Sequence, residues 1–202
     1  MIRTERDGGL VILTLDRPDK ANALTSGMLA TLADAVEAAS TDQTVHALVL
    51  TGAGKVFSAG ADLEAVGSGL ATDPVWERLS GALAACPVLT IAALNGTVAG
   101  GAMGMVLATD IRLAVSTAKV FYPVMSLGFL PQPSDPARLA ALVGPARARL
   151  ILMTGAKITA DEALTFGLVD RLADDVLTAA RDAAAPALAA DRSHVTALKA
   201  VT

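Results

Sequence analysis

The chain has 202 residues and a formal net charge of −4; 53% of its residues are hydrophobic and only 3% are aromatic. This length suits one domain, so we expect residues 1–202 to form a single domain whose core is built from Ala, Leu and Val. The acidic balance and the absence of a basic cluster argue against nucleic acid as a partner. Cys86 is the only cysteine, which excludes an internal disulfide and a cysteine-based zinc site, and we expect no metal.

The N-terminal residues, MIRTERD, are too charged for a secretory signal, so the cytoplasm is the expected location. The uncharged run 86–109 contains GxxxG spacings, which raises the alternative of a membrane helix. Pro87 and the turn-forming pair Asn95-Gly96 interrupt this run and divide it into a buried strand and a buried helix of ordinary length. We therefore expect no membrane span.

Strand-like and helix-like segments alternate along the chain. Runs rich in Val, Ile, Leu and Thr predict strands over 10–16, 45–51, 56–58, 88–94, 110–116, 119–124 and 168–172. Apolar residues at helical spacing, with capping and stop residues, predict helices over 25–40, 63–70, 74–85, 101–108, 137–142, 145–154 and 159–167, and a helical C-terminal extension over about 174–202. This alternation predicts an α/β fold with helices packed on parallel strands.

Two glycine-rich stretches, 57–63 (FSAGADL) and 95–104 (NGTVAGGAMG), each connect a strand-like run to a helix-like run. A strand, turn and helix start in this order present free backbone N–H groups where negative charge can develop. Two such turns brought together would form a two-donor oxyanion hole. The alternative is structural, because glycines also let a helix pack closely on a sheet. The stretches match neither a P-loop nor a dinucleotide fingerprint, and the hydrolase motif Gly-x-Ser-x-Gly is absent.

Motifs along nearly the whole chain resemble the crotonase (enoyl-CoA hydratase/isomerase) superfamily. They are LDRP and ANAL within 15–24, VFSAGADL over 56–63, LNG and AGGA within 94–102, ATDIR over 108–112, LGFLP over 127–131, and LMTG, ITADEA and GLVD within 152–170. The resemblance implies a spiral of ββα units, a homotrimer or hexamer, and an acyl-CoA thioester ligand whose enolate is stabilised. Coenzyme A would belong to the substrate, with no separate cofactor. The family's further C-terminal helices would begin near residue 202, so we expect a C-terminally short version of the fold.

The resemblance also implies site residues. The backbone N–H groups of Ala61 and Gly101 would be the two oxyanion donors. The residues expected to line the path of the substrate and its coenzyme A are Lys20, Ala21, Ala23, Ala59, Gly60, Asp62, Leu63 and Gly100. For Lys20 and Arg17, a place near the phosphates and a solvated surface charge are both open.

The sequence departs from the hydratase pattern at both glutamates that handle protons. These positions hold Gly104 and Val124, neither of which can carry a proton. Candidate substitutes are Asp135, the only carboxylate in the Pro-rich segment 128–136, and Tyr122; the alternatives are a loop cap or surface charge for Asp135 and packing for Tyr122. Three functions therefore stay open: an enoyl-CoA hydratase/isomerase-like enzyme, a non-catalytic acyl-CoA binding protein, and an enzyme with altered thioester chemistry such as decarboxylation.

Overall fold

The computed structural model describes residues 1–202 and contains two β-sheets. The larger sheet has the strand order β1 (Ile2–Asp7), β2 (Leu10–Leu15), β3 (Ala47–Gly52), β5 (Leu89–Leu94), β7 (Ile111–Ala114) and β10 (Arg171–Leu172). The smaller sheet has the order β4 (Val56–Ser58), β6 (Thr97–Ala99), β8 (Lys119–Phe121) and β9 (Ile158–Thr159). Neighbouring strands are parallel except in the pairs β1–β2 and β8–β9.

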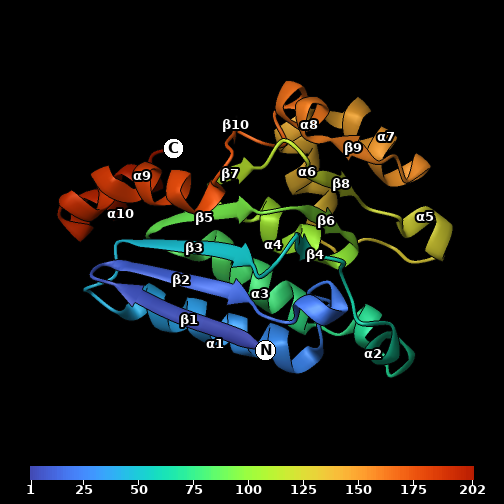
Figure 1. Cartoon of the computed structure of the whole chain (residues 1–202), viewed down its shortest axis with the longest axis horizontal. Coiled ribbons are helices and arrows are strands. Elements are labelled where there is room, and N and C mark those ends of the chain that lie inside the picture. Colours follow the sequence, from blue (N-terminus) through green and yellow to red (C-terminus); the bar gives the residue numbers. More distant parts are fainter.

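The chain winds as a spiral in which each turn adds one strand to each sheet. The strands β3, β5 and β7 of the larger sheet lead directly into β4, β6 and β8 of the smaller one. Helices make the returns: α1 (Ser26–Thr41) precedes β3, α2 (Leu63–Gly67) and α3 (Val75–Ala85) precede β5, and α4 (Met103–Leu107) precedes β7. This arrangement, visible in Figure 1, confirms the predicted α/β class with helices on parallel strands.

Helices cover both faces of the larger sheet. Side chains alternate along each strand, so apolar residues point to both faces and pack against these helices. On one face, residues such as Leu13, Leu48 and Ala92 join the core that includes the buried side chains of α1 and α3. On the other face, Ile12 and Val49 pack in a second cluster with α9 (Val176–Ala189). The chain ends with α10 (Arg192–Ala200).

The remaining helices are α5 (Val124–Leu127), α6 (Asp135–Val143), α7 (Pro145–Thr154) and α8 (Ala160–Phe166). Figure 1 shows them beside the smaller sheet, at the opposite end of the molecule from α9 and α10. None of the helices is both long and apolar enough to cross a membrane.

The structure differs from the predicted elements near the N-terminus and around the second glycine stretch. Strand β1 was not predicted, because five of its six residues are exposed and its sequence, IRTERD, lacks an apolar face. As the charged outer strand, it pairs with β2 and protects the sheet edge from another chain. The extended segment predicted over 119–124 is wrong at its end, since Val124 begins α5. The helix predicted over 101–108 divides into a 3-10 turn (Gly100–Ala102) and α4.

Replacement of Gly96 by Ala should destabilise the fold. A Cβ at Gly96 would collide with the carbonyl oxygen of Lys55 and lie 3.1 Å from the Cα of Val56. We expect Gly96→Ala to lower the free energy of unfolding by roughly 1–3 kcal/mol, as overpacking typically does. Urea unfolding followed by circular dichroism measures this. The control is Gly81→Ala in α3, where a Cβ meets nothing within 4 Å. That variant should gain about 0.5–1 kcal/mol, and equal midpoints for the two variants would contradict the prediction.

Candidate active site

The two glycine turns meet backbone to backbone. Gly60 has φ +93°, and a Cβ there would lie 2.7 Å from the carbonyl oxygen of Ala99 and 3.4 Å from the Cα of Gly100. Gly100 has φ +54°, also in the left-handed region. Only glycine combines this backbone conformation with so close an approach. The residues predicted as donors, Ala61 and Gly101, each follow one of these two touching glycines.

The N–H group of Ala61 points away from the adjacent segment 21–24. The Leu24 N–H donates to the carbonyl of Gly60 at 2.8 Å, and the Asp62 N–H donates to the carbonyl of Leu24 at 2.8 Å. Since N–H groups alternate in direction along an extended chain, the Ala61 N–H faces the other side, where it donates no hydrogen bond within the protein. Gly101 lies in the first turn of the 3-10 helix, where N–H groups have no partner inside the helix.

The predicted substrate-path residues form two segments, 20–23 and 59–63, which lie side by side in the structure. The Ala59 N–H donates to the carbonyl of Ala21 at 2.9 Å, so residues 21–24 run beside residues 59–62. Ala21 and Asn22 have φ of 49° and 54°, which is unusual outside glycine. The fully buried amide of Asn22 holds this turn, because its Nδ2 donates to the carbonyls of Ala53 and Val56 at 2.9 and 2.7 Å.

Two of the charged residues near the first glycine turn, Arg17 and Asp62, have structural partners. Arg17 Nη1 donates to Asp62 Oδ2 at 2.6 Å and to the carbonyl of Ala23 at 3.1 Å. Asp62 Oδ1 accepts two N–H groups at the start of α2, so this carboxylate caps that helix. The hydrogen bond from Arg17 is the main reason that the pKa of Asp62 is lowered. Lys20 is exposed, and Leu63 is 85% exposed at the first position of α2.

The carboxyl group of Asp135 lies on Gly104. A Cβ at Gly104 would be 3.0 Å from Asp135 Oδ1 and 3.3 Å from Oδ2. Asp135 is the first residue of α6 and is 1% exposed, so it is neither a loop residue nor a surface charge. Its carboxyl group therefore lies directly beside the space in which a side chain at position 104 would begin, where the resemblance places the first glutamate. Sequence spacing could not show this, because the contact joins two helices far apart in the chain.

Tyr122 holds one oxygen of this carboxyl group. The Tyr122 hydroxyl donates to Asp135 Oδ2 at 2.8 Å, whereas Oδ1 is buried and has no hydrogen-bond partner. Burial is the main cause that raises the pKa of Asp135 to about 6, and the hydrogen bond from Tyr122 opposes it. Burial, followed by the charge of Asp135, raises the pKa of Tyr122 as well. A carboxyl group that titrates near neutral pH and has one free oxygen is suited to proton transfer.

The indole ring of Trp76 lies on Gly101. A Cβ at Gly101 would be 2.9–3.1 Å from three atoms of this ring, and the Trp76 Nε1–H donates to the carbonyl of Leu70 at 2.8 Å. The sequence places Trp76 in the helix predicted over 74–85, yet its contact with the second glycine turn was missed. The only signal was that Trp76 is the single tryptophan of a chain poor in aromatic residues.

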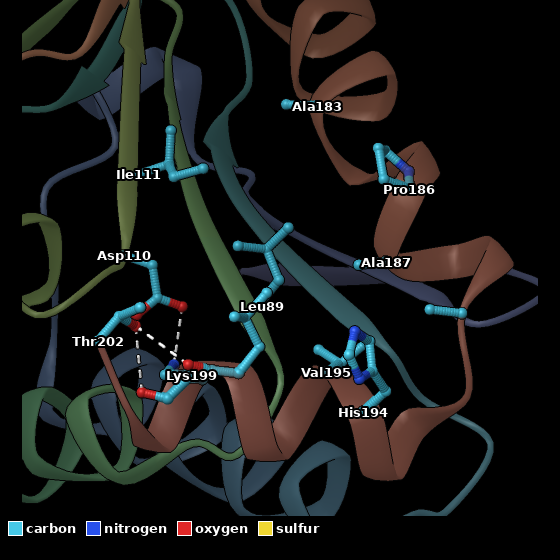
Figure 2. Close-up of a pocket in the computed structure, with 12 residues that line it drawn as sticks. Leu89, Asp110, Ile111, Ala183, Pro186, Ala187, His194, Val195, Lys199 and Thr202 are labelled. Atoms are coloured by element: carbon cyan, nitrogen blue, oxygen red, sulfur yellow. Dashed lines mark hydrogen bonds and ion pairs between the residues drawn. The ribbon is translucent and has the colours of Figure 1, made fainter.

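A separate cavity of about 570 Å³ lies at the other end of the larger sheet. Figure 2 shows it between α9, α10 and the first residues of β5 and β7, Leu89 and Ile111, with the Lys199–Asp110 ion pair at its side. In parallel sheets, ligands bind beyond the carboxyl ends of the strands. The glycine turns lie at that end, since β5 leads into the second turn, whereas this cavity lies at the amino ends.

Comparison with known proteins identifies the class of protein. The family model described as Enoyl-CoA hydratase/isomerase matches residues 5–202. EchA14 of Mycobacterium tuberculosis, described as a probable enoyl-CoA hydratase, is 40% identical over 200 residues, which are 96% of this chain and 78% of that protein. The crotonyl-CoA hydratase of Syntrophomonas wolfei is 35% identical over 174 residues, which are 83% of this chain and 67% of that protein.

The solved structures agree with this result. The crystal structure of the enoyl-CoA hydratase EchA8_6 from Mycobacterium marinum superposes with a TM-score of 0.89 at 33% identity, covering 98% of this chain and 96% of that chain. The chain belongs to the enoyl-CoA hydratase/isomerase family, within the crotonase superfamily that the sequence motifs predicted.

The buried carboxyl group of Asp135 should make stability depend on pH. The unfolded chain loses this proton near pH 3.8, whereas the folded chain keeps it up to about pH 6. The stability that Asp135 contributes is therefore complete below pH 3.8 and is lost as the pH rises through about 6, by roughly 2–3 kcal/mol in all. Asp135→Asn keeps an acceptor for Tyr122 but cannot titrate.

Urea unfolding at pH 4 and pH 7 measures this effect. The free energy of unfolding of the wild type, minus that of Asp135→Asn, should fall by roughly 2–3 kcal/mol between these two pH values. The control is Asp182→Asn, which changes an exposed carboxylate that makes no hydrogen bond. A pH-independent difference for Asp135→Asn would show that this carboxyl group titrates normally.

Proposed function

We propose that this protein binds an acyl-CoA thioester and stabilises its enolate with the backbone N–H groups of Ala61 and Gly101. Three observations support this. The two turns touch at Gly60 and Gly100, the Ala61 N–H has no partner within the chain, and the chain belongs to the enoyl-CoA hydratase/isomerase family. Removal of one such donor typically costs about 3–4 kcal/mol of transition-state stabilisation.

Asp135 is the proton-transfer group of this proposal, and its position on Gly104 is the observation that carries it. With Oδ2 held by Tyr122, Oδ1 is the oxygen without a hydrogen-bond partner, and we assign the proton exchange with the substrate to it. When the Asp135 carboxylate takes the proton on the carbon next to the thioester carbonyl, the C–H electron pair forms a C=C bond to the carbonyl carbon and the π electron pair of the C=O bond moves onto the oxygen. The negative charge then develops on the thioester oxygen, to which the two N–H groups donate hydrogen bonds. Return of the proton to a carbon atom restores the carboxylate.

The alternative is a non-catalytic acyl-CoA binding protein. It was suggested by the loss of both glutamates, and the carboxyl group found beside Gly104 favours an enzyme over it. Thioester chemistry other than hydration or isomerisation would use the same two donors.

We further propose that the protein works as a homo-oligomer in the cytoplasm, with coenzyme A as part of its substrate and no separate cofactor. Exposed apolar side chains on α5, α7 and the segment between α5 and α6 favour self-association; they are Met125, Leu127, Leu130 and Met153.

The replacement Asp135→Asn should remove proton transfer but leave binding intact. An NMR time course of a short 2-enoyl-CoA and a short 3-enoyl-CoA in D2O follows hydration, double-bond migration and α-proton exchange together. We expect the wild type to show at least one of these and the variant to lose it by roughly 10²–10⁴-fold, with the thioester dissociation constant unchanged. The control Asp182→Asn should behave as the wild type.

The outcomes separate the two functions. Equal rates for the wild type and Asp135→Asn, above the background without protein, would remove Asp135 from the mechanism. Thioester signals that broaden on binding while no bond changes, in the wild type as well, would favour the binding protein.

The oxyanion donor at Gly101 can be tested with a matched pair of variants. Gly101→Ala and Gly101→Pro both place a Cβ against the Trp76 ring, but only Pro removes the N–H group. We therefore expect the exchange rate of the Pro variant to fall a further 10²–10³-fold below that of the Ala variant. Circular dichroism checks that both are folded. Equal rates for two folded variants would remove Gly101 as a donor.

A further inference from the structure

Helix α3 contacts both halves of the proposed site through consecutive residues. Trp76 lies on Gly101 in the second glycine turn, as described above. The next residue, Glu77, binds Ser134, which immediately precedes Asp135. One helix turn therefore touches both the proposed oxyanion donor and the segment that carries the proposed acid–base group.

Glu77 forms a two-point contact with Ser134. Its Oε1 accepts the Ser134 backbone N–H at 3.1 Å, and its Oε2 accepts the Ser134 hydroxyl in a short hydrogen bond. Ser134 is the N-cap residue of α6, yet its own side chain makes no capping hydrogen bond to that helix. The carboxylate of Glu77 instead brings a negative charge to the N-terminus of α6, which the helix dipole favours. The start of α6 is thus fixed from α3.

The position of Asp135 depends on this contact. Asp135 is the first residue of α6, so a shift of Ser134 moves it directly. The distance between its Oδ1 and a Cβ built on Gly104 is only 3.0 Å, and its Oδ2 must also stay within reach of the Tyr122 hydroxyl. Proton transfer needs such placement to be held within a few tenths of an ångström.

Three titratable or charged side chains face Asp135. Tyr122 follows β8 and donates a hydrogen bond to it, Glu77 on α3 acts on it through its charge, and Arg138 lies one turn further along α6. The negative charge of Glu77 disfavours the Asp135 carboxylate, whereas the positive charge of Arg138 and the hydrogen bond from Tyr122 favour it. Arg138 forms no ion pair with Asp135, and its Nη1 is buried without a hydrogen-bond partner.

We propose that Glu77 is a positioning residue for Asp135, which it fixes through its two hydrogen bonds to Ser134 while placing a negative charge at the start of α6. This role rests on the proposed function of Asp135 as the proton-transfer group. Two separable effects follow, one geometric and one electrostatic, and two replacements of Glu77 distinguish them.

Glu77→Gln removes the charge but keeps an acceptor for the Ser134 N–H and a donor for its hydroxyl. We expect the midpoint of the Asp135 titration, followed by the ¹³C signal of its carboxyl carbon, to move to lower pH by roughly half a unit. The midpoint of the acid limb of the exchange rate should move in the same direction. Glu77→Ala also removes both hydrogen bonds, so its maximal exchange rate should fall at least tenfold below that of Glu77→Gln.

Glu162→Gln is the matched control. Glu162 accepts the backbone N–H and the hydroxyl of Thr159, the N-cap residue of its own helix α8, so it also binds both groups of an N-cap residue. The Glu162→Gln replacement should leave the titration midpoint of Asp135 and the exchange rate unchanged. A titration midpoint equal in the wild type, Glu77→Gln and Glu162→Gln would overturn the electrostatic role. Equal maximal rates for folded Glu77→Ala and Glu77→Gln would overturn the positioning role.

The titration separates this inference from the proposed function. It needs no turnover, so it reports on Glu77 even if the wild type proves inactive toward both enoyl thioesters. If Asp135→Asn retains the full rate while Glu77→Gln still moves the midpoint, the proposed function fails and the contact between Glu77 and the Asp135 segment stands as a structural one.

Discussion

The site depends on the close approach of two backbone turns, at Gly60 and at Ala99-Gly100. The contact is possible because Gly60 has no side chain, and the parallel pairing of β4 with β6 brings the two turns to the same edge of the smaller sheet. An N–H group fixed in this way needs little reorganisation when charge develops beside it, which is the basis of electrostatic catalysis. The spiral fold makes this contact possible, because consecutive turns of the spiral place β4 and β6 side by side in the smaller sheet.

The second constraint is that the carboxyl group of Asp135 packs directly against Gly104, which has no side chain. The short helix α4 offers a bare Cα where the family pattern would place a glutamate, and α6 supplies a carboxyl group to the same spot from another part of the chain. Tyr122 and burial then determine how this group titrates. The side chain that fills the space between two helices therefore need not come from the residue that a sequence motif indicates.

The sequence predicted the parallel strands, most helices and both glycine turns, because apolar periodicity and turn residues are local signals. It did not predict β1, because this strand is stabilised by pairing with β2 and its sequence has no apolar pattern. It named Asp135 and Tyr122 as candidates through their place in the chain but could not join them, since their hydrogen bond depends on how α6 packs. It overlooked Trp76 and Glu77, because helical spacing alone does not tell which neighbour a helix residue touches.

The contact between Gly104 and Asp135 has an evolutionary consequence. A glutamate at 104 conflicts with an aspartate at 135, because its Cβ would lie only 3.0–3.5 Å from three atoms of the existing carboxyl group and it would bring a second negative charge into a buried site. Gain of the glutamate alone is thus harmful while Asp135 remains, and loss of Asp135 alone leaves position 104 empty. A stepwise change from one arrangement to the other would therefore pass through an intermediate with a crowded site or with no carboxyl group there. The two positions should therefore change together among relatives.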